Sequence, residues 1–277
     1  MLSSNPGPIG IFDSGYGGLT ILDAIRRELP QYDYLYLGDN ARAPYGPRSF
    51  DVVYEFTRQA VEKLFEQGCH LVILGCNTAS AKALRTIQQH DLPLLDPHRR
   101  VLGIIRPTAE VIGSLTESRH VGVLATEGTI KSESYTLEIQ HKNPDIQVTG
   151  VACPFWVPLV ENNEIDSPAA DYFVKRRLDE IMLADPLIDA IILGCTHYPL
   201  LMPKIMQYKP ANVRIVSQGS YVAESLHRYL ERHPDMAAKC SCGGVVRYLT
   251  TENPEKFKDS ARIFLDETID VENITLG

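Results

Sequence analysis

The sequence has no apolar run long enough to cross a membrane and no cluster of Lys and Arg residues. A membrane helix needs roughly eighteen or more apolar residues, so we expect no membrane-spanning segment. The net charge of −8 does not suit a nucleic-acid surface, which needs a basic face to neutralise phosphates. The first ten residues, MLSSNPGPIG, lack the charged and apolar parts of a secretion signal. We therefore expect a cytoplasmic protein that binds small molecules.

Cysteine is also scarce, with 6 residues in a chain of 277. This density is too low for a disulfide scaffold, and a reducing compartment would keep the thiols free. The closest cysteine pair, Cys240-Ser-Cys242 with His233 nearby, departs from the spacing of zinc sites, so we expect no metal. The chain is 44% hydrophobic and 22% charged, which is typical of globular proteins, and its length suffices for two domains.

Two cysteines stand in matched contexts. Residues 71–80 read LVILGCNTAS and residues 190–200 read AIILGCTHYPL, so each apolar run ends in Gly-Cys. Both runs predict buried strands with Cys76 and Cys195 at their carboxyl ends, where open α/β sheets bind ligands. A single cysteine at such a place is more often a small buried hydrophobe. Two in matched positions favour a functional role.

A second similarity indicates an internal repeat. Residues 121–135, VGVLATEGTIKSESY, resemble residues 9–23, IGIFDSGYGGLTILD, at an offset of 112 (121 − 9), and the cysteines repeat at 119 (195 − 76). Matched order and near-constant spacing indicate two related halves. Alternating strand and helix patterns predict parallel strands joined by right-handed crossovers. We expect two similar α/β domains with mainly parallel sheets, related by a pseudo-two-fold axis, with the active site in the cleft between them. Residues 1–104 with 218–277 form the first predicted domain, and residues 105–217 form the second.

Proline and apolar periodicity suggest the remaining elements. Strands are predicted over 8–12, 32–38, 101–105 and 121–125, and helices over 19–29, 50–66, 79–90, 171–183 and 219–231. Residues 91–100, with two prolines and two arginines, predict a loop, as does the proline-broken stretch that carries Trp156 and Glu161. Glu161 is either solvated at a loop end or placed in the cleft as an acid–base group.

A glycine-rich turn, Asp13-Ser-Gly-Tyr-Gly-Gly18, follows the first predicted strand. Its backbone amides and the helix behind it predict a site for an anionic group such as a carboxylate or phosphate. The turn is no dinucleotide motif, because Thr20 stands where the last glycine belongs, and it lacks the lysine of a phosphate-binding loop. The alternative is a purely structural turn.

Two opposed thiols suit the inversion of a carbon centre. Racemisation needs a base on one face of the carbon and an acid on the other, and the roles exchange in the reverse direction. A free cysteine has a pKa of about 8.5 that neighbours can lower, so thiol and thiolate can coexist near neutral pH. His197 can hydrogen-bond Cys195, whereas Asp13 opposes a thiolate at Cys76 unless it takes or shares a proton. A lone histidine is more often structural.

Four stretches together resemble the glutamate racemase family, within the aspartate/glutamate racemases. They are IGIFDSGYGGLT at 9–20, DNARAPYG at 39–46, GCNTAS at 75–80 and GCTHYPL at 194–200, and the resemblance spans most of the chain. It implies cofactor-independent racemisation of L-glutamate to D-glutamate for peptidoglycan precursors, without metal. By motif position it implies Cys76 and Cys195 as the catalytic acid–base pair, assisted by Asp13 and His197. The implied substrate-contacting residues are Asp13, Ser14, Tyr45, Gly46, Asn77, Thr78, Thr196 and His197, with Thr126 and Glu161 as further members. A homodimer and a cell-wall precursor as effector fit the same resemblance.

Some positions depart from the family pattern. Tyr16 and Asn40 replace a small apolar residue and a Thr, and the segment 91–108 differs most, which leaves any regulatory contact there open. Aspartate racemases typically read Gly-Gly-Met-Gly in the first loop and Thr-Glu after the second cysteine, so the motifs here favour glutamate over aspartate. Two other classes stay open: a Cys–His hydrolase or amidotransferase with the turn 15–18 as oxyanion site, and a binding protein without catalysis.

Overall fold

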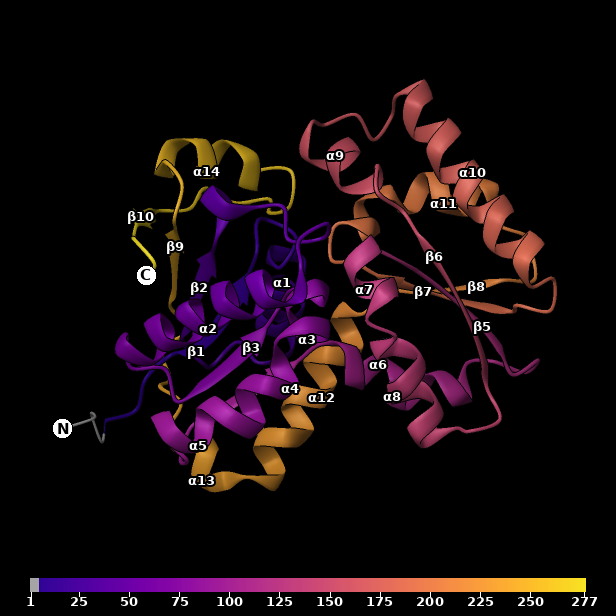
Figure 1. Ribbon diagram of the computed structural model, residues 1–277. Coiled ribbons are helices and arrows are strands. Elements are labelled where there is room, and N and C mark those ends of the chain that lie inside the picture. The colour runs from indigo at the N-terminus through magenta and orange to yellow at the C-terminus, as the bar shows by residue number, and fades with distance from the viewer. Residues whose placement is uncertain (1–4) are drawn as a thin grey trace.

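The computed structural model describes residues 5–277, so residues 1–4 of the first predicted domain lie outside the described residues. Figure 1 shows two α/β halves side by side, one built on a 6-stranded sheet and the other on a 4-stranded sheet. Within each sheet, all pairings of neighbouring strands are parallel. The prediction of two α/β units with mainly parallel sheets is confirmed.

The two sheets share one strand order. The first runs β10-β9-β2-β1-β3-β4 and the second runs β6-β5-β7-β8, so the segment β2-β1-β3-β4 corresponds to the whole second sheet. The strands of the first sheet are β1 (Ile9–Asp13), β2 (Tyr34–Gly38), β3 (Leu71–Leu74), β4 (Arg100–Gly103), β9 (Val246–Thr250) and β10 (Val271–Asn273). Those of the second are β5 (His120–Ala125), β6 (Gln147–Ala152), β7 (Ala190–Gly194) and β8 (Arg214–Val216). β1 and β5 correspond, as do β3 and β7, which is the repeat that the sequence predicts.

Helices cover both sheets, and the last segment of the chain returns to the first half (Figure 1). The first half carries α1 (Leu19–Glu28), α2 (Phe50–Glu66), α3 (Asn77–Lys82), α4 (Leu84–Thr86), α5 (Leu92–Leu95), α12 (Gly219–Arg232), α13 (Pro234–Ala237) and α14 (Pro254–Ala261). The second carries α6 (Ile105–Val111), α7 (Glu127–Lys131), α8 (Ser134–Lys142), α9 (Trp156–Glu161), α10 (Pro168–Ala184) and α11 (Met202–Tyr208). Shorter turns are η1 (Asn40–Arg42), the π-helix η2 (Ile87–Asp91), η3 (Ile112–Ser114) and η4 (Tyr198–Leu201).

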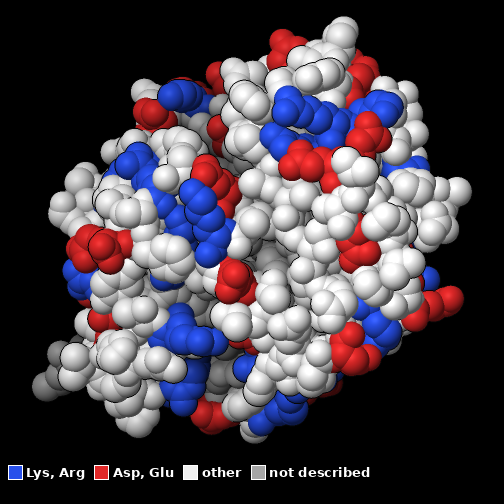
Figure 2. Space-filling model, turned by 45° about the vertical axis from the view of Figure 1, so that its right-hand side comes forward, with Lys and Arg blue, Asp and Glu red and all other residues white. Residues whose placement is uncertain are grey.

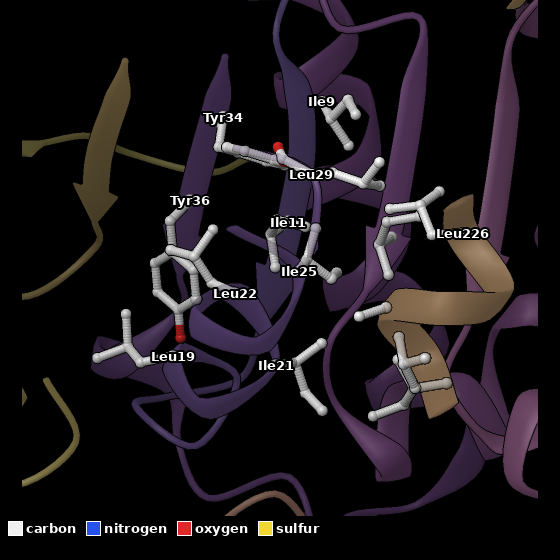
Figure 3. Packing of buried hydrophobic residues seen from close by; sticks show 14 of the residues in the cluster. Ile9, Ile11, Leu19, Ile21, Leu22, Ile25, Leu29, Tyr34, Tyr36 and Leu226 are labelled. Carbon is white, nitrogen blue, oxygen red and sulfur yellow. The ribbon is translucent and has the colours of Figure 1, made fainter. Parts of the chain in front are cut away.

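The core of the first half joins α1 to both the sheet and α12 (Figure 3). Leu22 and Ile25 lie one turn apart on α1 and pack with Ile11 and Tyr36 of the sheet, and all four are 0% exposed. Leu226 of α12 belongs to the same cluster. Burying each such side chain contributes about 1.5–3 kcal/mol. This apolar contact anchors α12 in the first half although the preceding strand, β8, belongs to the second sheet.

Two predicted loops contain helices instead. In the predicted loop 91–100, residues 92–95 form α5, which directly continues α4 and η2 and contains Pro93, whereas residues 96–99 are not helical. The stretch before Glu161 forms α9, with Pro158 at its third residue. The first N–H groups of a helix have no intrahelical acceptor, so a proline there removes no hydrogen bond. The loop prediction before Glu161 was wrong because proline interrupts a helix only beyond its first turn, whereas Pro93 follows a helical run whose preceding residues form the π-helix η2.

Charges of both signs alternate over the face of the molecule in Figure 2, and no broad single-sign patch covers it. Among residues 5–277, no helix combines the length and the apolar character that crossing a membrane requires.

Candidate active site

Cys76 and Cys195 stand at corresponding ends of the two sheets. Cys76 follows β3 after Gly75, and Cys195 directly follows β7. Both carry free thiols and each residue is 6% exposed. They are close enough for the charge of Cys195 to contribute to the raised pKa of Cys76. The two cysteines of the sequence repeat are therefore neighbouring buried thiols in the folded protein.

Cys76 lies among hydrogen-bond donors and one carboxyl group. Its Sγ caps α3 by accepting a hydrogen bond from the Ala79 amide at 3.4 Å, and it lies 3.4 Å from Ser14 Oγ. Burial, reinforced by the charge of Asp13, raises the pKa of Cys76 to about 12, against the lowering effect of Ser14 and Ala79. The protonated thiol is therefore the resting form of Cys76 at neutral pH.

The glycine-rich turn binds the protein's own carboxylate. Gly15 N donates to Asp13 Oδ2 at 2.9 Å, and the Gly18 amide also hydrogen-bonds Asp13, which is 1% exposed. Burial raises the pKa of Asp13, while His197 and the two amides oppose that rise. A Cβ at Gly18 would lie 2.6 Å from Asp13 Cβ, so this close approach requires glycine. The anion site predicted in the turn is thus filled by Asp13 at two of its amides.

Cys195 has a different neighbour, an imidazole paired with a carboxylate. His197 Nδ1 lies 3.9 Å from Cys195 Sγ, and His197 Nε2 lies 2.9 Å from Glu161 Oε1. Burial alone would lower the pKa of His197, but the contacts with Cys195 and Glu161 raise that pKa to about 10. The imidazolium form then donates to Glu161 from one nitrogen and faces the sulfur with the other. Glu161 lies against His197, on the side of the imidazole away from Cys195, and its side chain is 32% exposed.

Gly17 brings the two halves together at this point. A Cβ on Gly17 would lie 2.3 Å from Thr196 Oγ1 and 2.4 Å from His197 Nδ1. Thr20 Oγ1, one turn later, donates to the Thr196 carbonyl at 3.1 Å. The first-half turn therefore packs directly on the Cys195 motif, and only glycine fits at position 17.

Further contacts between the halves involve predicted site residues. Thr78 Oγ1 lies 3.0 Å from Thr126 Oγ1, which ties α3 to the start of α7. The Gly46 carbonyl accepts a hydrogen bond from Gly128 N at 3.0 Å. Asn77 Nδ2 donates to Gln218 Oε1, and Asn77 Oδ1 accepts from the Tyr135 hydroxyl, each at 2.8 Å. The structure therefore brings these residues to the same border as the thiols.

Tyr45 is the predicted residue whose side chain is most fully committed elsewhere. Its hydroxyl donates to Asp39 Oδ2 at 2.5 Å, and the residue is 1% exposed. Arg42 Nε and Thr251 Oγ1 also donate to Asp39, at 2.7 and 2.9 Å. The Tyr45 phenol is therefore occupied within the protein. Sequence reasoning missed Asp39, although its place just after β2 was a usable signal.

The cysteine pair near the C-terminus lies apart from these residues. Cys240 is buried and Cys242 is exposed. Within residues 5–277 no group of three or more His, Cys, Asp or Glu side chains is arranged to hold a metal ion.

The fold and the strand-end thiols define an α/β protein of two related halves with a pair of acid–base groups at their border. The model of the Asp/Glu/hydantoin racemase family matches residues 19–225. A glutamate racemase of Ruegeria sp. (strain TM1040) is 40% identical to this chain, and the match covers 95% of this chain and 98% of that relative. The chain belongs to the Asp/Glu/hydantoin racemase family and is an isomerase, which confirms the resemblance seen in the sequence.

Solved structures of glutamate racemases show the same fold. Isoform RacE1 from Bacillus anthracis has a TM-score of 0.88 at 33% identity, with 98% of both chains covered. The Francisella tularensis enzyme in complex with D-glutamate has a TM-score of 0.86 at 30% identity, again over 98% of both chains. The Escherichia coli enzyme in complex with L-glutamate and the activator UDP-MurNAc-Ala has a TM-score of 0.77 at 27% identity, over 98% of this chain and 99% of that one.

Proposed function

We propose that the protein interconverts L-glutamate and D-glutamate, with Cys76 and Cys195 as the two acid–base groups. The observation that carries the proposal is the pair of buried free thiols at corresponding strand ends of two matched sheets. One thiolate takes the α-proton as the C–H bond breaks, and the other thiol gives its proton to the opposite face of the carbanion. The product is the mirror image, and the two sulfurs have exchanged protonation states.

The neighbours of each sulfur support this assignment. Ser14 and the Ala79 amide favour negative charge on Cys76, and the imidazolium of His197 favours it on Cys195. Asp13 and His197 are the proposed assisting groups. The polar groups proposed to hold the carboxylates and the ammonium of the substrate are Ser14, Tyr45, Gly46, Asn77, Thr78, Thr126, Glu161, Thr196 and His197.

A single-thiol hydrolase is less compatible with the site. It would need the turn 15–18 as an oxyanion site, yet the Gly15 and Gly18 amides hydrogen-bond Asp13. It would also leave one of the two matched cysteines without a role. Membership of a racemase family agrees with the two-thiol scheme.

Isotope exchange tests the mechanism. Racemisation started from either enantiomer in heavy water should abolish the optical signal without release of ammonia. At early times deuterium should enter mainly the product, because the incoming proton comes from a thiol that has exchanged with solvent. Rapid labelling of recovered substrate would instead indicate a single base and overturn the two-base assignment.

The proposed substrate is glutamate rather than aspartate. The relative and the solved structures described above are glutamate racemases, and two were solved with a glutamate enantiomer. An extra methylene moves the distal carboxylate, and a pocket fitted to one length leaves its polar groups unpaired with the other. We expect strong glutamate preference after dialysis against chelator and without added cofactor. Equal or faster turnover of aspartate, or activity lost and then restored by metal, would contradict this.

The proposed physiological role is the supply of D-glutamate for peptidoglycan precursors in the cytoplasm, where the six free thiols would stay reduced. A cell-wall precursor is the proposed effector. In its support, a cavity of ≈ 600 Å³ lies between the halves and is lined by Lys82, Arg85, Arg106 and Arg232, of which Arg85 and Arg106 pair with Glu138 and Glu110 of the same lining. Assembly as a homodimer stays a prediction.

The proposed domains are residues 1–104 with 218–277, and residues 105–217. The separation of the strands into two sheets supports this division. The chain leaves the first sheet after β4 and leaves the second after β8, so each boundary lies between a strand and the helix that follows.

A further inference from the structure

A chain of three buried hydrogen bonds runs from Ile104 to Tyr135 and passes through Asn77, the residue after Cys76. Gln218 Nε2 donates to the Ile104 carbonyl at 2.9 Å, and Asn77 Nδ2 donates to Gln218 Oε1 at 2.8 Å. The Tyr135 hydroxyl donates to Asn77 Oδ1 at 2.8 Å. Gln218, Asn77 and Tyr135 are each 3% exposed or less. Water therefore offers little competition for any of the three bonds.

The direction of every bond in this chain follows from one backbone carbonyl. The Ile104 oxygen can only accept, so the amide nitrogen of Gln218 must face it and Oε1 must face Asn77. Only the Nδ2 group of Asn77 can donate to that oxygen. Asn77 Oδ1 is then left to accept from Tyr135. The carboxamide next to Cys76 is thereby held in a single orientation.

The chain also connects the places where the polypeptide passes between the halves. Ile104 lies between β4 and α6, and Gln218 directly precedes α12. At its other end, Tyr135 packs on the residue before the second thiol, since a Cβ at Gly194 would lie 3.0 Å from Tyr135 Cε2. Asn77 follows Cys76 directly. The hydrogen-bonded residues thus link the two segments that pass between the halves to the residues beside both cysteines.

We propose that Gln218 and Tyr135 are positioning residues that hold Asn77 and so fix the placement of Cys76 relative to Cys195. The inference rests on the proposed racemisation and extends it to residues that contact neither sulfur. Proton transfer from carbon depends steeply on geometry, and a displacement of about 1 Å can cost about a hundredfold in rate. A rigid, fully paired network across the border of the halves supplies the required placement.

The test replaces single hydrogen-bonding groups and keeps side-chain volume. Gln218→Met removes the carboxamide, and Tyr135→Phe removes only the hydroxyl. Two controls lie outside the network: Tyr34 is buried, as Gln218 and Tyr135 are, whereas Gln88 is exposed. Gln88→Met removes an amide that donates to the Val101 carbonyl at 2.7 Å, and Tyr34→Phe removes a buried hydroxyl that donates to the Leu29 carbonyl at 2.6 Å.

We expect kcat to fall roughly three- to tenfold in Gln218→Met and Tyr135→Phe, the size of one lost hydrogen bond. Both controls should stay within about twofold of the unsubstituted protein, even where Tm falls by a similar amount. The two enantiomers are equal in energy, so kcat/KM must fall by the same factor in both directions. Agreement between the two measured factors is an internal check of the kinetic data. A change confined to KM or to Tm overturns the inference.

A double variant tests whether the residues act as one unit. If they share a network, Gln218→Met with Tyr135→Phe should lower kcat by less than the product of the two single effects. Effects that simply multiply would contradict the shared network. If Gln218→Met does not fold, Tyr135→Phe decides, because it keeps the ring that packs on Gly194. An unsubstituted protein that does not racemise glutamate would overturn the proposed function, and with it this inference.

Discussion

The two cysteines occupy corresponding backbone positions but have different chemical neighbours. Cys76 faces a hydroxyl and a buried carboxyl group, Ser14 and Asp13, and burial with Asp13 raises its pKa to about 12. Cys195 faces an imidazole whose far nitrogen is paired with Glu161. The repeat therefore duplicated the strand and the thiol but not the groups that control the proton.

This difference bears on how one site treats two mirror-image substrates. A thiolate at Cys76 must form against a nearby carboxyl group, so Asp13 has to be protonated or compensated by His197 when it does. Cys195 instead faces His197, whose pKa is raised to about 10 by its contacts with Cys195 and Glu161. The two directions of the reaction thus begin from unequal electrostatic settings, although their equilibrium is symmetric.

The largest expected effect comes from removing either thiol. Cys76→Ser and Cys195→Ser should each abolish racemisation, a loss of about 10²–10⁴-fold, because an alcohol is a far poorer acid–base group here. Each variant should still exchange the α-hydrogen of one enantiomer with solvent, and the two should differ in which enantiomer they label. Cys240→Ser, at a residue 5% exposed and outside the site, is the control. Near-normal turnover of both enantiomers by either variant would refute the two-base mechanism.

A smaller loss is expected where the turn packs on the Cys195 motif. Gly17→Ala places a Cβ 2.3 Å from Thr196 Oγ1 and 2.4 Å from His197 Nδ1, so both side chains or the turn itself must shift. Overpacking of this kind costs about 1–3 kcal/mol, which we expect to appear as a roughly tenfold or greater loss of kcat/KM. Gly15→Ala is the matched control, since its Cβ would meet nothing closer than 3.7 Å. Equal activity in the two variants would show that this contact is dispensable.

Ser14 tests the Cys76 side on its own. Ser14→Ala removes a hydrogen bond that lowers the pKa of Cys76, so that pKa should rise further and the rate should fall about two- to tenfold. Because neutral pH lies far below this pKa of about 12, the thiolate fraction should fall by the same factor at every pH below about 10, which lowers the whole rate–pH profile. Ser14→Thr retains a hydroxyl and should recover most of the activity. A rate–pH profile that is unchanged in Ser14→Ala would argue against this role.

The last expected effect concerns stability rather than rate. The pKa of His197 is about 10 in the folded protein and 6.5 in its ordinary state, so the folded protein binds this proton more tightly. The resulting stabilisation is fully present below pH 6.5 and is lost as the pH rises through about 10. His197→Gln should flatten this part of the decline in the free energy of unfolding, measured by denaturant titration across that interval. Identical slopes in the two proteins would contradict it, and the exposed His141→Gln serves as control.

The sequence by itself determined the strands, the turn and the position of the thiols. Apolar runs that end in Gly-Cys specify β3 and β7 locally, because a buried parallel strand is continuously hydrophobic and its end carries the polar residues. The repeat of this pattern was sufficient to predict two matched parallel sheets. The same local logic failed at α9, where Pro158 looked like a break but falls in the first turn.

Only the tertiary structure decided which groups surround the sulfurs. His197 meets Glu161 across 36 residues, and Asn77 meets Gln218 across 141. No periodicity or spacing encodes such pairs, because side chains this far apart in the chain become neighbours only when packing brings their elements together. The same holds for Asp13, whose carboxylate fills the turn that looked like a ligand site. Local sequence patterns determine where each strand ends. Burial and long-range hydrogen bonds determine the protonation state of the side chains at those strand ends.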